Sequence, residues 1–420
     1  MQTFLSAFSC VLLLAATVQA GDWPGWRGPT GQGTSDEKDL PLTWKGSAGE
    51  NIAWKTRLPG QEGKNKQDEN QSSPIVVKGK VIVTVSFWPG DADRAKTQPE
   101  HHVACYNAAD GKQLWDEKIP PGPWKLTDLR GGYTAPTPAS DSERIYVAFG
   151  SSVLAALDMD GKTVWRKEIV PYDFDVAFAA SPVLYGETVI LQCDGVKGSS
   201  RLLGFDRKTG DLKWDQKRPK NNFSHSTPVI AKIKDKDQLL IAASDVLQGA
   251  DPTNGQILWW CSAKGDTVSP VLGGGVVYVD SGRGGPGYAV DPTGSGDVTK
   301  THLKWKAGTV PDGFSSPVIV GDYLYRLHNP AILKCWKLDT GEAVFSERLD
   351  GITTGSSPVA TADGRIYLAS GGRSYVIKAG PKLDVLAVNE LGDNGPASPA
   401  VSDGRLFIKG RQFLYGIGKK

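Results

Sequence analysis

The chain has 420 residues, of which 39% are apolar, and its 48 Lys and Arg against 46 Asp and Glu give a formal charge of +2. A chain of this length buries a large core, and its 50 Gly and 27 Pro stay below the share typical of low-complexity sequences. The near-neutral balance excludes a strongly basic surface, so we expect no nucleic acid as the main partner.

The first predicted element is a secretory signal peptide at residues 1–20. An apolar run over residues 4–18 is followed by small and polar residues, with Ala20 at the expected cleavage point. The run is shorter than the ~20 apolar residues that a membrane-spanning helix needs. We therefore expect cleavage near Ala20 and a periplasmic or secreted protein without a membrane span.

Residues 21–50 are predicted to form an N-terminal extension. The extension begins Asp22-Trp-Pro-Gly-Trp-Arg-Gly-Pro29, and this alternation of Trp with Gly and Pro is incompatible with a helix. We expect the extension to lie across the folded domain and to plug or clasp it.

The cysteines beyond the signal peptide are predicted to be buried free thiols. They are far apart in the sequence, and none has the spacing of a zinc or haem site. They are Cys105, Cys193, Cys261 and Cys335.

A Ser/Thr-Pro pair followed by β-forming residues recurs eight times. A proline at the first position of a strand costs no ladder hydrogen bond, so each pair predicts the start of a strand. The pairs are Ser73-Pro74, Thr137-Pro138, Ser181-Pro182, Thr227-Pro228, Ser269-Pro270, Ser316-Pro317, Ser357-Pro358 and Ser398-Pro399. Repeats of about 40–45 residues with four short strands each are the signature of a β-propeller.

A second motif alternates with the first and consists of a turn ending in Gly, with Trp four residues later. The turn predicts a hairpin from the third strand of each repeat, C, to the fourth, D, which carries the Trp. An indole at this position fills the space between neighbouring blades. The clearest pairs are Gly111 with Trp115, Gly161 with Trp165, Gly210 with Trp214, and Gly255 with Trp259.

The two ends of the chain are predicted to complete one blade together. Residues 413–417 have the pattern of a C strand, and only three residues follow them. Residues 51–55 carry Trp54 ahead of the first Ser-Pro pair and can supply the missing D strand. The sequence therefore predicts an all-β, eight-bladed propeller over residues 51–420, with an N-terminal strand completing the last blade and no open edge.

These repeats resemble the PQQ-like repeats of the quinoprotein alcohol dehydrogenase-like superfamily. The resemblance implies a propeller fold, and it leaves the activity open, because the superfamily holds both enzymes and non-enzymatic members such as the outer-membrane assembly lipoprotein BamB. The enzymes use pyrroloquinoline quinone (PQQ) with calcium and an Asp base, beneath a disulfide between adjacent cysteines. This chain has no Cys-Cys pair and no matching motif around an Asp, Asn or Glu, so no catalytic or metal residue is assigned.

The candidate binding residues lie in loops that should share one face of the ring. In an up-and-down blade, the loops from strand B to C and from D to the next A lie on one face, called here the loop-rich face. Two candidate arginines lie in Gly-rich turns, which suit an anion or form ordinary flexible loops. The candidates are Asp194, His225, Asp245, Arg283, His328 and Arg373.

Three functions follow, in order of preference. The first is a monomeric binding or scaffold module that takes a protein, peptide or small molecule on the loop-rich face. The second is a PQQ- and calcium-dependent oxidoreductase, with this cofactor implied by the family resemblance alone. The third is a BamB-like envelope assembly factor, which the lack of a suitably placed lipid-attachment cysteine disfavours.

Overall fold

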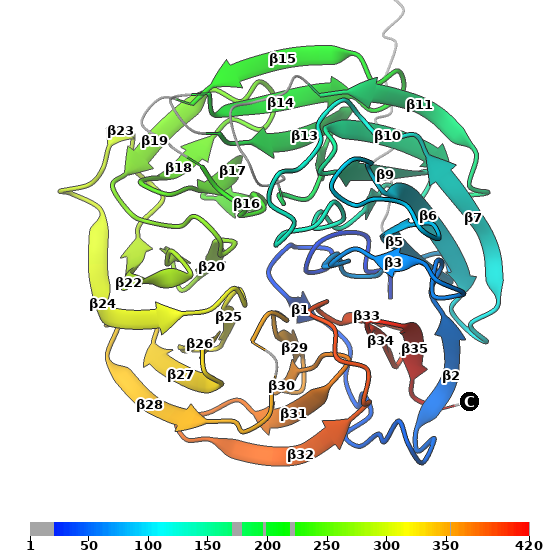
Figure 1. Cartoon of the computed structure of the whole chain (residues 1–420). Helices are drawn as coiled ribbons and strands as arrows, with labels where there is room; N and C mark the ends of the chain where they lie inside the picture. Colours follow the sequence, from blue (N-terminus) through cyan, green and yellow to red (C-terminus); the bar gives the residue numbers. More distant parts are fainter. Residues whose placement is uncertain (1–20, 170–178, 196–198, 219–222, 353, 420) are drawn as a thin grey trace, which may run out of the picture.

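The structure, a computed structural model, describes residues 21–169, 179–195, 199–218, 223–352 and 354–419. Within these ranges the regular structure is entirely β, and the strands surround a central axis (Figure 1). They form eight four-stranded antiparallel blades, which confirms the predicted propeller. The predicted signal peptide lies outside the described residues.

In each blade, strand A lies nearest the axis and strand D forms the outer edge. Blades 1 to 4, each in the order A to D, are β4 (Ile75–Val77), β5 (Lys80–Trp88), β6 (Glu100–Asn107), β7 (Gln113–Ile119); β8 (Ala139–Ser140), β9 (Arg144–Phe149), β10 (Val153–Asp158), β11 (Thr163–Glu168); β12 (Val183–Tyr185), β13 (Thr188–Cys193), β14 (Arg201–Asp206), β15 (Leu212–Lys217); and β16 (Val229–Ile233), β17 (Lys236–Ala242), β18 (Leu247–Ala250), β19 (Ile257–Cys261).

The remaining blades follow the same order. Blades 5 to 8 are β20 (Val271–Gly273), β21 (Val276–Val279), β22 (Arg283–Val290), β24 (Leu303–Asp312); β25 (Val318–Val320), β26 (Tyr323–His328), β27 (Ile332–Lys337), β28 (Ala343–Arg348); β29 (Val359–Thr361), β30 (Arg365–Leu368), β31 (Arg373–Lys378), β32 (Asp384–Glu390); and β33 (Ala400–Ser402), β34 (Arg405–Lys409), β35 (Phe413–Ile417), β2 (Ile52–Arg57). Three two-residue strands add to blade edges: β1 (Thr34–Ser35), β3 (Lys66–Gln67) and β23 (Gly296–Asp297).

The ring closes through the N-terminal strand, as predicted. Strand β2 pairs antiparallel with β35, placing Trp54 opposite Gly416. Figure 1 shows the two ends of the chain, blue β2 and dark red β35, side by side. Blade 8 therefore holds the chain ends together, and no blade is left with three strands.

The tryptophans of the D strands pack between blades. The Trp115 indole donates from Nε1 to the Met159 carbonyl of blade 2 at 3.2 Å, and it lies against Gly161, where an added Cβ would fall 2.6 Å from the ring. Trp54, Trp165 and Trp305 donate to the next blade in the same way, at 2.9 Å each. Glycine closes these hairpins because it adopts positive φ and leaves room for the indole.

A ring of hydrogen bonds between the Ser/Thr-Pro pairs surrounds the axis. In every pair, the backbone N–H of the Ser or Thr donates to the side-chain hydroxyl of the corresponding residue in the next blade, at 2.8–3.2 Å. The eighth bond runs from Ser398 back to Ser73 and completes the circle. We call these eight side chains the hydroxyl ring. They explain why the repeat requires a hydroxyl before the proline.

The N-terminal extension covers the axis on the face opposite the loop-rich face. Trp23 exchanges backbone hydrogen bonds with Val76 of β4, and β1 pairs with β29 of blade 7. Between these contacts, Trp26 reaches the hydroxyl ring and donates from Nε1 to Ser269 Oγ at 3.0 Å. The extension thus pairs open edges of inner strands and occupies one end of the axis. The domain boundaries at residues 20 and 50 stay predictions.

The four cysteines are buried and free, in agreement with the sequence analysis. Burial raises the pKa of the Cys105 and Cys335 thiols to about 12. Within the described part of the chain, no helix has the length and hydropathy required to cross a bilayer.

Removing one hydroxyl from the ring should destabilise the whole propeller. Ser357→Ala leaves the buried Ser316 N–H without its acceptor, which costs about 1–3 kcal/mol. We expect a lower thermal unfolding midpoint, measured by circular dichroism. Ser357→Thr keeps the hydroxyl, as Thr137 and Thr227 do naturally, and should stay near wild type. Equal losses in both variants would show that the hydroxyl is not the stabilising group.

Candidate functional site

A cavity of about 340 Å³ occupies the axis and opens on the loop-rich face. Each of the eight D-to-A connections contributes to its wall, and the Trp26 indole lines its inner end. The polar and aromatic wall residues are Gln71, Arg130, Ser181, His225, Thr227, Thr267, Ser269, Arg283, Phe314, Ser316 and Ser398. The cavity is therefore a pocket that is open on the loop-rich face. Its inner end is lined by Trp26 of the extension and by residues of the hydroxyl ring.

Arg283 and Asp266 form an ion pair beside this cavity. Arg283, the first residue of β22, is half exposed and pairs through Nε with Asp266 Oδ2 at 3.0 Å. Burial raises the pKa of Asp266 to about 6, although Arg283 opposes this rise. The second carboxylate oxygen of Asp266 is buried without a hydrogen-bond partner in the structure. The Arg283 guanidinium also lies 5.5 Å from the centre of the Phe223 ring.

His225 lies beside Arg283 in the D-to-A connection from blade 3 to blade 4. Its backbone N–H donates to the Asp266 carbonyl at 2.6 Å, which ties the two loops together. Burial lowers the pKa of His225 to about 4, and the positive charge of Arg283 contributes. His225 is therefore neutral at physiological pH and supplies ring nitrogens rather than charge.

The cavity wall also carries Arg130, from the connection between blades 1 and 2, and Phe314, which follows the β24 residue that pairs with Arg283. Arg130 is 85% exposed and pairs with Asp128 two residues before it. Phe314 is the most exposed large apolar side chain of the described residues, at 57%. A cationic and aromatic rim of this kind suits a ligand that combines an anionic group with a flat apolar surface.

Of the six candidate residues, only His225 and Arg283 line this cavity. Asp194 is fully buried and ion-paired with the buried Arg218, with both Nη1–Oδ distances near 2.5 Å. His328 is buried too, with its Nδ1 3.1 Å from the Pro311 carbonyl and its ring edge-on to Trp336. These two predicted binding residues are structural, because neighbouring blades cover them.

Asp245 and Arg373 are exposed on the loop-rich face but belong to separate blades and stand apart from the cavity wall. Asp245 accepts a hydrogen bond from the adjacent Ser244, and Arg373 donates to the Asp350 carbonyl at 3.3 Å. The sequence analysis omitted Asp266 from the candidates, and it placed no residue of the extension at the cavity. The only sequence feature that pointed to the extension lying at the cavity was the pair of tryptophans at its start.

The described residues do not fit a calcium–quinone centre. Calcium requires several oxygen ligands, usually carboxylates. No Asp or Glu is among the described residues that line the cavity, and the nearby Asp266 and Asp128 are held by arginines. The described residues also contain no group of three or more His, Cys, Asp or Glu side chains arranged to hold a metal ion.

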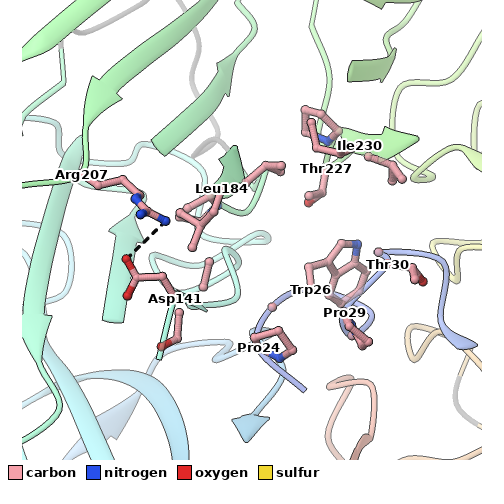
Figure 2. Close-up of a pocket in the computed structure, with 18 residues that line it drawn as sticks. Pro24, Trp26, Pro29, Thr30, Asp141, Leu184, Arg207, Thr227 and Ile230 are labelled. Atoms are coloured by element: carbon pink, nitrogen blue, oxygen red, sulfur yellow. Dashed lines mark ion pairs between the residues drawn. The ribbon is translucent and has the colours of Figure 1, made fainter. Parts of the chain in front are cut away.

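A second cavity, of about 260 Å³, lies on the opposite face (Figure 2). Its walls are the extension around Trp26, the first strands of blades 2 to 4 and Arg207 of blade 3. Figure 2 shows Trp26, Pro29 and Thr30 on one side and the Asp141–Arg207 ion pair, 3.5 Å long, on the other. Trp26 lines both cavities, so its indole stands between the two ends of the axis.

Comparison with known proteins identifies the class of propeller. A family model described as "Outer membrane protein assembly factor BamB" matches residues 99–347, more than half of the chain. The chain belongs to this family of PQQ-like repeat propellers. No curated protein sequence matches it significantly.

Solved structures share the fold at low sequence identity. BamB from Moraxella catarrhalis superposes with a TM-score of 0.59 at 15% identity, covering 88% of this chain and 98% of that one. A europium-containing methanol dehydrogenase gives 0.71 at 11% identity, covering 95% and 91%. Quinohemoprotein alcohol dehydrogenase ADHIIG from Pseudomonas putida HK5 gives 0.64 at 12%, covering 98% and 83%. Enzymes and an assembly factor thus share this architecture, so the fold alone does not decide the activity.

A buried lysine gives the propeller a pH-dependent stability. Lys409 is fully buried and donates from Nζ to Ser72 Oγ at 2.7 Å and to the Thr84 carbonyl at 3.1 Å. Burial lowers its pKa from 10.5 to about 7, with Asp68 opposing. Between pH 7 and 10.5 the unfolded chain binds the extra proton, so this residue makes stability rise with pH. The unfolding free energy of the wild type minus that of Lys409→Met should increase as the pH rises from 7 to 10.5. A difference that stays constant would contradict the account.

Proposed function

We propose that this protein is an exported binding module whose axial cavity receives an anionic group of its ligand. The observation that carries the proposal is the composition of the cavity wall. Two arginines, two aromatic side chains and five residues of the hydroxyl ring line a pocket that opens only on the loop-rich face, and no described carboxylate is among its lining residues. Hydrogen-bond donors and the two guanidinium groups favour an anion over a cation, although Asp266 and Asp128 partly neutralise these arginines.

The aromatic residues extend this preference to flat anionic ligands. Phe314 is exposed at the rim and Trp26 lines the inner end, so an aromatic or extended carboxylate can contact both. The same wall would accept an acidic side chain or chain terminus of a partner protein. We therefore propose small carboxylates and acidic peptide segments as the ligand class.

The location and the oligomeric state are part of the proposal. The sequence of residues 1–20 supports export to the periplasm or beyond, and so does the description of the matching family model as an outer membrane protein assembly factor. A monomer is proposed because the ring closes within one chain.

A quinone-dependent oxidoreductase is the second candidate, favoured by the structural likeness to alcohol dehydrogenases. The present residues support it less well, because calcium would find no described carboxylate in the cavity wall. A BamB-like assembly role is compatible with the binding proposal, since it also requires a partner on the propeller surface.

Pyrroloquinoline quinone, a planar tricarboxylate, tests both candidates. We expect isothermal titration to show binding that is equal with Ca²⁺ and with EGTA. Arg283→Gln should weaken it roughly 10- to 100-fold through loss of a charge-assisted contact, whereas Arg348→Gln on an outer strand should leave it unchanged. Binding that requires Ca²⁺ would favour the oxidoreductase, and no binding in either buffer would contradict an anion site in this cavity.

The same binding should strengthen as the pH falls. Asp266 neutralises Arg283 when ionised, and its pKa is about 6, so its protonation releases the positive charge of Arg283 toward the cavity. His225, with a pKa of about 4, stays neutral over this range. We expect tighter binding at pH 5 than at pH 7.5, and a pH-independent affinity in Asp266→Asn. An unchanged pH dependence in Asp266→Asn would assign the effect to another group.

A further inference from the structure

We propose that the inner end of the axis holds a second, separate site, which binds a small inorganic anion such as chloride on the guanidinium of Arg27. This site lies in the extension next to Trp26 and is distinct from the cavity of the proposed function. Two observations carry it: the burial of Arg27 without a complete set of partners, and its uncompensated charge.

Arg27 is buried, with 3% of its surface exposed. Its Nη2 donates to the Pro317 carbonyl at 2.5 Å. Its Nε and Nη1 are also buried, and neither has a hydrogen-bond partner in the structure. Buried guanidinium N–H groups are almost always paired, so two unpaired ones on a single side chain indicate a missing acceptor.

The charge of Arg27 is uncompensated as well. Within the described part of the chain it forms no ion pair, and the charged group that acts on it most is another arginine, Arg326. Arg326 itself is neutralised by Asp280, with an Nε–Oδ2 distance of 3.0 Å. Burial lowers the pKa of Arg27 to about 9, so it still carries its charge at neutral pH. A buried cation without a counter-ion is strongly unfavourable, and a bound anion removes this penalty.

The described neighbours of Arg27 come from blades 6 and 7 and from Gly33 of the extension. Pro317 and Pro358, whose carbonyls approach Arg27 and Gly33, directly follow Ser316 and Ser357 of the hydroxyl ring. Gly33 has a positive φ of 74°, and a Cβ there would fall 2.9 Å from Arg27 Nε. A side chain at residue 33 would therefore collide with the guanidinium, so only glycine allows Arg27 to lie in this position.

A small monovalent ion fits this arrangement best. A water molecule would pair the free N–H groups but leave the charge uncompensated, and a cation would be repelled by the guanidinium. Large anions are disfavoured because the described surroundings of Arg27 are tightly packed. Chloride is the probe we choose, and bromide is its counterpart for X-ray detection.

The test compares sodium chloride with sodium methanesulfonate, whose larger anion carries no carboxylate, at equal ionic strength. Preferential binding to the folded state should raise the thermal unfolding midpoint of the wild type by about 1–3 °C in chloride. Arg27→Met should lose this difference, whereas Arg348→Met, on the outer strand β28, should retain it. Arg283→Gln should also retain it, which separates this site from the cavity on the loop-rich face.

A crystal grown in sodium bromide gives a second readout that needs no variant. We expect an anomalous peak within hydrogen-bond distance of Arg27 Nε and Nη1. A peak elsewhere only, a water molecule at this position, or a chloride effect that persists in Arg27→Met would overturn the proposal. If Arg27→Met fails to fold, the bromide crystal of the wild type decides alone.

Discussion

The hydroxyl ring is the constraint on which the rest of the propeller depends. Eight amide-to-hydroxyl hydrogen bonds fix the innermost residue of each blade against its neighbour, and the last one joins Ser398 to Ser73. The tryptophans of the D strands perform the corresponding task at the outer rim. Between these two circles the blades have little freedom to slide. Variation is therefore confined to the loops and to the extension that occupies the axis.

Repetition made most of the fold predictable from the sequence. Each Ser/Thr-Pro pair and each turn followed by Trp occurs often enough to be recognised, and the lone strand around Trp54 could be matched to the incomplete eighth repeat. The site was less predictable, because it depends on single residues that approach across the axis. Asp194 has the composition of a binding residue, but its pairing with Arg218 is visible only in three dimensions. His225 and Arg283 were found because their loops lie on the same face.

The N-terminal extension adds binding features that the repeats alone do not supply. Its Trp26 separates two cavities, and Arg27 brings a buried charge to the centre of a ring built from neutral hydroxyls. Neither residue belongs to a repeat, so family membership carries no information about them. The chemistry of this propeller is therefore concentrated in the eight D-to-A connections and in one short non-repetitive segment.

The central claim is that the extension turns an axial channel into a closed pocket. A high-resolution crystal structure of the chain from residue 21 onward tests it most directly. We predict that the Trp26 indole lies on the axis, bonded to Ser269, and separates the cavity on the loop-rich face from the cavity on the opposite face. An extension detached from the inner strands, with a continuous solvent channel through the ring, would contradict the account.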